Sequence, residues 1–292
     1  MGRPCRAGHG ARALTVDISG RVAVVTGGAS GIGRSLCLAL AERGAAAVVV
    51  ADVDAGGAAE VAAAVEAGGS RALAVAADMT READAEALVA QAEDRFGPVD
   101  LFCSNAGIIV DGGVEVPDDA WSRIWAINVQ SHVYVARALL PRMLARGEGY
   151  LVLTASAAGL LTELGSAPYS VTKHAAVALA EWLSITYGDR GLRVSCLCPQ
   201  AVRTNLIATS HRQVSAMPEV RTGLGTPQAS VDGVLTPEQV AAVVIDAIAD
   251  ERFLILPHPE VAMYEQRRAD DRERWLRGMR RLQARLSGQQ PA

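Results

Sequence analysis

A phenol and an amine stand four residues apart in the segment Tyr169-Ser-Val-Thr-Lys173. On a helix, residues at i and i+4 share a face, so these two side chains meet. A free tyrosine has a pKa of about 10, which is too high for a good base near neutrality. One cation at about 4 Å, in an effective dielectric near 20, contributes roughly 4 kcal/mol, enough to bring that pKa to about 7 to 8. We therefore expect Tyr169 to act as a general acid and base whose pKa is lowered by Lys173.

Lys173 is also the only lysine of the chain, because all the other residues among the 28 Lys and Arg are Arg. Arginine would supply the same charge, so charge alone does not explain the exception. A compact ammonium has three rotatable donors that can reach a ligand hydroxyl and the tyrosine together. It can also pass a proton along a water chain, whereas a guanidinium stays protonated. The lysine therefore indicates a working proton-transfer site.

A glycine-rich turn lies far upstream, where the segment VVTGGASGIGRSL places Gly27, Gly31 and Gly33 between an apolar run and a helix-like segment. Glycines let the backbone approach a pyrophosphate, and a helix N-terminus supplies free N–H groups and a positive dipole. A tight strand-to-helix turn without a ligand is the alternative. The position of this turn, at the first strand-to-helix connection, favours dinucleotide binding.

Asp52 closes the second apolar run, 19 residues after Gly33. A carboxylate at this place can take the two ribose hydroxyls of an adenosine, and it repels a 2′-phosphate. Val53, rather than a basic residue, follows it. The sequence therefore favours NAD over NADP as the cofactor.

Apolar runs and helix-like segments alternate along the chain and must position these residues. The runs predict strands at 21–27, 45–52, 71–78, 99–107, 149–156, 192–199 and 252–257. Helices are expected at 31–43, 56–67, 80–96, 117–146, 167–188, 236–250 and about 260–286. Almost wholly apolar strands that alternate with helices imply a parallel sheet covered on both faces. We predict an α/β protein with a single doubly wound Rossmann-type domain and a mainly parallel seven-stranded sheet.

Three regions are expected along the chain. Residues 1–18 form a disordered lead-in, 19–258 the catalytic domain with a substrate lid at 200–235, and 259–292 a helical tail. The tail has an apolar stripe set among arginines, and such a stripe is expected to pack on the domain or on another subunit. The stripe consists of Trp275, Leu276, Met279, Leu282 and Leu286.

The composition excludes several classes of protein. A formal net charge of −4 and a pI near 5.8 give no basic field for nucleic acid or an anionic membrane. No apolar run approaches the ~18 residues of a membrane span, and residues 1–17 lack the apolar region of a signal peptide. Cys196-Leu-Cys198 has neither metal nor redox spacing, so no metal site is expected and the cysteines fit a reducing cytoplasm.

Together the motifs resemble the short-chain dehydrogenases/reductases of the classical type. The resemblance covers about residues 19–257 and rests on TGGASGIG at 26–33, Asp52, Asp78, NAG at 105–107, Asn128, Ser156 and YSVTK at 169–173. It implies a nicotinamide cofactor and hydride transfer to or from a carbon that bears oxygen. It also implies that Ser156 polarises the substrate oxygen and that Asn128 holds a water linking Lys173 to solvent.

The resemblance further implies a set of cofactor contacts. Asp78 is expected near the adenine amino group, with Met79 over the ring edge, and Val202 and Thr204 near the nicotinamide carboxamide. The set is Gly27, Ser30, Gly31, Ile32, Gly33, Asp52, Val53, Asp78, Met79, Asn105, Ala106, Gly107, Tyr169, Lys173, Pro199, Val202 and Thr204.

Two positions depart from the pattern of the family. Ser104 stands where the family often has Asn, and little effect is expected. Gln200 stands where many relatives have Gly, and it can alter the substrate wall or the carboxamide contact. By location after the fifth and sixth strands, an apolar substrate face is expected from Leu160, Leu161, Leu164, Gln200, Leu206 and Ile207, with local loop packing as the alternative.

The sequence thus predicts an NAD-dependent oxidoreductase that acts on a secondary alcohol or ketone, with Tyr169 as general acid and base. An NADPH-linked ketoacyl reductase is one alternative, and Asp52 argues against it. A non-catalytic nucleotide-sensing protein of the same fold is another, and the intact set of Ser156, Tyr169 and Lys173 argues against it. The resemblance implies a homotetramer or homodimer.

Overall fold

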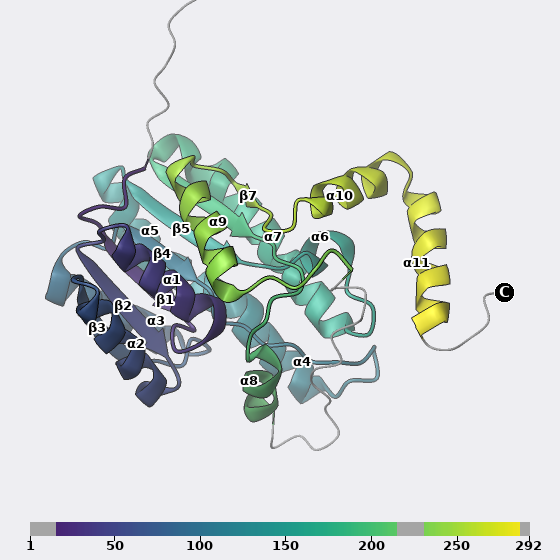
Figure 1. Ribbon diagram of the computed structural model, residues 1–292, viewed down its shortest axis with the longest axis horizontal. Coiled ribbons are helices and arrows are strands. Elements are labelled where there is room, and N and C mark those ends of the chain that lie inside the picture. The colour runs from purple at the N-terminus through teal and green to yellow at the C-terminus, as the bar shows by residue number, and fades with distance from the viewer. Residues whose placement is uncertain (1–15, 215–230, 287–292) are drawn as a thin grey trace, which may run out of the picture.

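The computed structural model describes residues 16–214 and 231–286 (Figure 1). Most of the expected lead-in, the lid segment 215–230 and the tail end 287–292 lie outside the described residues. At the start of the described chain, the Val16 N–H donates to the Ala249 carbonyl at 3.1 Å, and Ile18 is buried. Residues 16–18 of the expected lead-in therefore pack on the domain.

A seven-stranded sheet forms the centre of the molecule and confirms the predicted fold. Its order is β3-β2-β1-β4-β5-β6-β7, and every pair of neighbouring strands is parallel. Each strand lies within one of the predicted apolar runs. The strands are β1 (Val22–Thr26), β2 (Ala47–Asp52), β3 (Arg71–Ala76), β4 (Leu101–Ser104), β5 (Gly149–Thr154), β6 (Leu192–Leu197) and β7 (Leu254–Ile255).

The apolar strand residues are buried on both faces of the sheet because successive side chains point to opposite sides. Val24 and Phe102 pack into one cluster, with α3 (Glu82–Phe96), α5 (Ser131–Arg146) and α7 (Ala167–Tyr187). Val25 and Cys103, the next residues along, pack into the other cluster, with α1 (Gly31–Glu42), α2 (Ala55–Ala67) and α9 (Pro237–Ala249). This two-sided core explains why these strands lack a polar alternation.

The expected long helix over 117–146 is interrupted. It consists of α4 (Asp118–Trp125), the π-turn η1 (Ala126–Gln130) and α5. Single π-turns inside helices often lie at functional sites. Here the turn carries Asn128, whose side chain is fully buried.

The expected loop at 200–235 contains a helix, α8 (Leu206–Gln213). A second short helix, α6 (Ala158–Leu161), follows β5, and a 3-10 turn, η2 (Gly188–Arg190), precedes β6. The α9 helix begins as its sequence predicts, with Thr236 and Gln239 forming a capping box. Short helices are hard to recognise in such segments because they contain fewer than three turns of apolar repeat.

The tail forms two helices rather than one, α10 (Glu260–Asp270) and α11 (Arg272–Leu286). Asp271 breaks the helix with φ −147° and ψ 88°. The Arg268 guanidinium donates to the Leu160 carbonyl, and the Tyr264 hydroxyl donates to Asp232 at 2.9 Å, so α10 is held on the body. No α11 residue is buried, and Figure 1 shows this helix, in yellow, standing off the body.

None of the described helices is long and apolar enough to cross a membrane.

Candidate active site

The glycine-rich turn connects β1 to α1, and its glycines have different tasks. Gly27 and Gly31 have φ values of +64° and +52°, a region that favours glycine, and both line a cleft at the carboxyl ends of the strands. Gly33 does not line that cleft. A Cβ on Gly33 would lie 2.0 Å from the Gly27 carbonyl oxygen. Gly33 is therefore needed for the close packing of α1 against the turn.

Asp52 ends β2 beside this turn. Its two carboxylate oxygens accept the N–H groups of Ala29 and Asp54, each at 3.0 Å. These bonds hold the carboxylate at the rim of the cleft, which Val53 also lines with half of its surface exposed. The carboxylate has lone pairs left for further donors.

Asp78 follows β3 and lines the same cleft. One of its oxygens accepts the Thr80 N–H at 3.0 Å and the Thr80 hydroxyl at 2.7 Å, while Met79 is buried. Nη1 of Arg123, on α4, lies 4.0 Å from Oδ2 of Asp78. Nη2 of the same guanidinium donates to the side-chain oxygen of Gln213 at the end of α8. The sequence did not point to Thr80, Arg123 or Gln213, because these residues come from segments without a recognisable motif.

Asn105 ties three strand ends together. Its N–H donates to the Thr26 hydroxyl at 2.9 Å, and its side-chain amide donates to the Thr26 carbonyl at 3.1 Å. Its amide oxygen accepts the Thr154 hydroxyl at 3.1 Å. A residue that links the ends of β1, β4 and β5 in this way fixes the floor of the cleft.

Lys173 and Asn128 meet beside Gly107. The buried Lys173 ammonium donates to the Thr154 carbonyl at 2.9 Å. Asn128 accepts the Ile108 N–H and donates to the Ile108 carbonyl, both at 2.9 Å. A Cβ on Gly107 would lie 3.3 Å from both the Asn128 amide oxygen and the Lys173 nitrogen. The loop after β4 can pass between these groups because residue 107 has no side chain.

Ser156 and Tyr169 face each other at the end of β5 and the start of α7. The Ser166 hydroxyl caps α7 by accepting the Tyr169 N–H at 3.3 Å, which sets where the helix begins. Ser156 and Tyr169 both line the cleft, and the Ser156 hydroxyl donates to the Pro199 carbonyl at 3.4 Å. The Ser156 oxygen also accepts the Ala158 N–H at 3.1 Å. The Lys173 nitrogen lies 5.6 Å from the centre of the Tyr169 ring.

The ionisation of this pair differs from the expectation. Desolvation raises the pKa of Tyr169 to about 12, although the Ser156 side chain opposes this rise. Desolvation also lowers the pKa of Lys173 to about 8. The expected lowering of the Tyr169 pKa by the lysine charge does not include the cost of removing both groups from water. With the lysine directed at the Thr154 carbonyl, the protein alone keeps Tyr169 protonated at neutral pH.

One departure from the pattern of the family has a structural partner. The Ser104 hydroxyl lies 2.6 Å from Nδ1 of His132 on α5, and both residues are buried. Desolvation, together with the Lys173 charge, lowers the pKa of His132 to about 3. The imidazole is therefore neutral, and it contributes no second positive charge next to Lys173.

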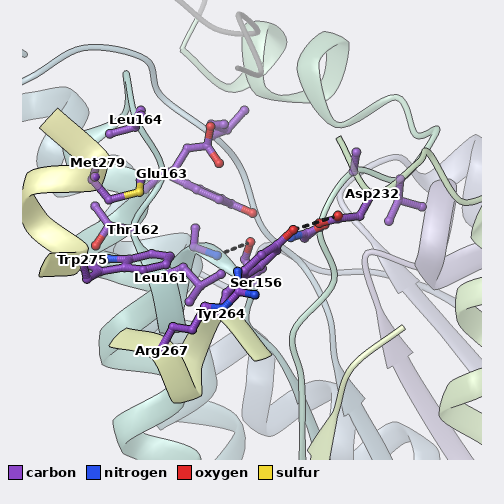
Figure 2. Close-up of a pocket in the computed structure, with 18 of the residues that line it drawn as sticks. Ser156, Leu161, Thr162, Glu163, Leu164, Asp232, Tyr264, Arg267, Trp275 and Met279 are labelled. Atoms are coloured by element: carbon purple, nitrogen blue, oxygen red, sulfur yellow. Dashed lines mark hydrogen bonds between the residues drawn. The ribbon is translucent and has the colours of Figure 1, made fainter. Parts of the chain in front are cut away.

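A larger cavity of about 970 Å³ adjoins the cleft. Ser156 and Tyr169 line both spaces, as do Gln200, Val202, Thr204 and Leu206. Leu161, Leu164 and Ile207 also line the cavity, whereas Leu160 does not, although both Leu160 and Leu161 pack into the core. Figure 2 shows Ser156 inside this cavity, with Leu161 and Leu164 among its lining residues.

The cavity has lining residues that the sequence did not assign to a site. Tyr264, Arg267, Trp275 and Met279 reach it from the two tail helices. Trp275 and Met279 belong to the apolar stripe recognised in the tail, but their spacing could not show which surface the stripe would meet. The side-chain oxygen of Gln200 is buried and has no hydrogen-bond partner among the described residues.

The fold is that of a doubly wound α/β protein with a cleft at the carboxyl ends of its strands, and comparison with known proteins gives the family. A family model described as short chain dehydrogenase matches residues 21–215. The 1-deoxy-11-beta-hydroxypentalenate dehydrogenase of Streptomyces exfoliatus is 36% identical, over 86% of this chain and 88% of that protein. The 3beta-hydroxysteroid dehydrogenase 2 of Eggerthella lenta is 32% identical, over 82% of this chain and 91% of that protein.

Two further similarities agree with these. The cyclohexanol dehydrogenase of an Acinetobacter species is 32% identical, over 83% of this chain and 93% of that protein. The crystal structure of a short-chain dehydrogenase/reductase from Burkholderia phymatum in complex with NAD matches with a TM-score of 0.81. It is 32% identical and covers 88% of this chain and 96% of that one. The chain therefore belongs to the short-chain dehydrogenase/reductase family and is an oxidoreductase.

Proposed function

We propose that this protein transfers hydride between NAD and a secondary alcohol or its ketone, with Tyr169 as general acid and base. One observation carries the proposal. The cleft and the larger cavity meet at Ser156 and Tyr169, so both residues line the two spaces. A cofactor in one and a substrate in the other would have their reacting atoms beside these two hydroxyls.

The residues of the cleft fit a nicotinamide dinucleotide. Gly31, at a positive φ, opens a helix N-terminus that suits a pyrophosphate, and Asp52 offers a carboxylate to ribose hydroxyls. Gly107, whose Cβ would crowd Asn128 and Lys173, keeps the cleft open beside the lysine. When bound, the nicotinamide supplies or accepts the hydride.

Proton transfer falls to the side chains of this chain. Ser156 donates to the substrate oxygen and holds it beside the Tyr169 hydroxyl. The protonated Tyr169 is the proton donor for ketone reduction, and it has to lose this proton for alcohol oxidation. Lys173, with a pKa of about 8, is close enough to neutrality to exchange protons near physiological pH. Asn128 as the next member of a proton relay is part of the same proposal.

NAD rather than NADP is proposed on account of Asp52. The Ala29 and Asp54 N–H groups hold the Asp52 carboxylate at the rim of the cleft, and a carboxylate at the end of the second strand would repel a 2′-phosphate. The test compares kcat/KM for NADH and NADPH in the wild type and in Asp52→Ala. We expect the wild type to favour NADH by at least about tenfold, which corresponds to roughly 1.4 kcal/mol. The variant should lose this preference, because it lacks the carboxylate that repels a 2′-phosphate. A wild type that favours NADPH would support the ketoacyl reductase alternative.

The substrate class is tested with a panel of secondary alcohols and NAD⁺, followed by the absorbance of NADH. Three of the relatives are named as dehydrogenases of a hydroxypentalenate, a hydroxysteroid and cyclohexanol, which supports the choice of cyclic alcohols for this panel. We expect turnover by the wild type and none by Tyr169→Phe. A wild type that binds NADH but oxidises no alcohol and reduces no ketone would favour the nucleotide-sensing alternative.

Self-association is proposed as well. Three apolar side chains on the outer face of α7 are exposed: Val171 by 48%, Trp182 by 54% and Ile185 by 84%. An exposed apolar helix face of this kind suits an interface between copies of the chain. Light scattering coupled to gel filtration should give a dimer or tetramer, and Ile185→Glu should shift it toward the monomer.

A further inference from the structure

The outer wall of the substrate cavity comes from the tail helices, far along the chain from the reacting groups. Trp275 and Met279 are four residues apart on α11, so they project from the same face of that helix. Both line the cavity that Ser156 and Tyr169 line at its inner end. Figure 2 shows the two side chains gathered with Leu161, Thr162 and Leu164.

The size of the cavity decides which alcohols can fill it. Pockets that enclose drug-sized molecules are about 300–1,000 Å³, and this cavity, at about 970 Å³, is at the upper end of that range. A single-ring alcohol held at Ser156 would fill only a small part of this volume. A substrate with several fused rings would fill more of it and have more surface to contact the tail helix that lines the same cavity.

The chemistry of the lining points to a neutral, apolar body. The lining includes the aliphatic side chains of Ile109, Leu161 and Leu206, and α11 adds an indole and a thioether. The charged lining residues are of both signs and include three arginines and four carboxylates: Arg267, Arg274, Arg281, Glu163, Asp232, Asp270 and Asp271. Three of these carboxylates already accept hydrogen bonds: Asp232 from the Tyr264 hydroxyl, Asp270 from the Gln266 amide and Asp271 from the Arg274 N–H. With charges of both signs in the lining, the cavity does not favour a negatively charged substrate.

We propose that Trp275 and Met279 determine specificity for neutral alcohols of several fused rings by forming the outer wall of the substrate cavity. The inference rests on the proposed function of the site. It assigns to α11 a contact with the substrate and no part in hydride or proton transfer. Not every residue of the apolar stripe takes part, since Leu276, which is 42% exposed, does not line the cavity.

The experiment measures kcat/KM with NAD⁺ for three probes of increasing size: cyclohexanol, decahydro-2-naphthol and androstan-3β-ol. The variants are Trp275→Ala, Trp275→Phe and Met279→Ala, and Leu276→Ala on the same helix is the matched control. We expect the wild type to prefer the larger alcohols. Trp275→Ala and Met279→Ala should lower kcat/KM for the four-ring alcohol about tenfold, through KM, and change the value for cyclohexanol less than twofold. Leu276→Ala should leave all ratios unchanged.

Several results would overturn the inference. A wild type that prefers cyclohexanol would overturn it, as would a loss in Trp275→Ala that is equal for all three alcohols. Should Trp275→Ala lower the melting temperature, Trp275→Phe, which keeps an aromatic ring, and Met279→Ala decide the question. Failure of the proposed function has a different signature, because the wild type would then oxidise none of the probes.

Discussion

The cofactor cleft and the outer wall of the substrate cavity are built in opposite ways. The cleft is made of backbone turns that fit together without spare room, as with Gly33 against the Gly27 carbonyl and Asn105 between three strands. The outer wall is made of side chains on α11, a helix with no buried residue. If the proposed roles hold, we expect the reaction to depend on the part of the molecule that tolerates least change, and substrate choice on the part that tolerates most.

Replacement of Lys173 by Arg should have the largest effect on the cleft side. The guanidinium keeps the charge but stays protonated, and it is bulkier than the ammonium that fits beside Gly107. We expect kcat to fall about a thousandfold, in the range of 10² to 10⁴ typical of general acid–base catalysis, which is about 4 kcal/mol of barrier. Steady-state kinetics measure the loss, and circular dichroism checks the fold. Near-normal turnover by this variant would contradict the proposed proton-transfer role of Lys173.

Gly33→Ala should destabilise the whole domain. Its Cβ would lie 2.0 Å from a backbone oxygen that no side-chain rotation can move. We expect a loss of about 3 kcal/mol or more in the free energy of unfolding, together with weaker NADH binding. Gly56→Ala is the matched control in α2, because its Cβ would meet nothing closer than 3.6 Å. Equal denaturation midpoints for the two variants would contradict the packing role of Gly33.

Lys173→Met should change how stability depends on pH. Burial lowers the pKa of Lys173 from 10.5 to about 8, so between these values the unfolded chain binds a proton that the folded chain lacks. The wild-type free energy of unfolding should therefore gain up to roughly 3 kcal/mol from this group as the pH rises across that window.

The variant has no such group and should lack this gain. Urea unfolding at pH 7.5, 9 and 10, without dinucleotide, gives the comparison. Staying at or below pH 10 avoids the opposite contribution of Tyr169, whose raised pKa of about 12 costs stability at higher pH. Parallel pH profiles for the two proteins would mean that Lys173 keeps its charge in the folded state.

Gly278→Ala should have the smallest effect, because it lies on α11. The nearest atom to its added Cβ is the end of the Arg281 side chain at 4.0 Å, so no clash arises. Ala favours a helix over Gly by about 0.5–1 kcal/mol. Since α11 can open without the core, we expect amide hydrogen exchange in this helix to slow up to about fivefold, with little change in the global melting temperature. A melting temperature raised by several degrees would show that α11 unfolds with the domain.

The fold and the cleft were predictable because their signals are local. Each strand is an apolar run, and the glycine turn and the Tyr169–Lys173 spacing are each confined to a few consecutive residues. Of the residues expected to bind the cofactor, all but Gly33 line the cleft. Gly33 contributes indirectly, because its close packing on Gly27 shapes the turn whose other residues line the cleft.

The rest depends on how distant segments pack. Leu160 and Leu161 are neighbours in sequence and both pack into the core, yet only Leu161 lines the cavity, because successive residues of a helix point in different directions. Asp271 breaks the tail helix through its own backbone conformation, which composition does not reveal. The raised pKa of Tyr169 follows from burial, and the sequence shows the neighbouring charge but not the loss of water.

The attachment of α10 has a consequence for changing this protein by design. Arg268 and Tyr264 fasten α10 to α6 and to the segment before α9, and the chain then turns at Asp271. Among the described residues beyond that turn, 272–286, none is buried, and none is proposed to transfer protons or hydride. We expect residues 272–286 to be exchangeable between relatives as a cassette, so that a library confined to them would search new substrates while the reaction centre stays unaltered.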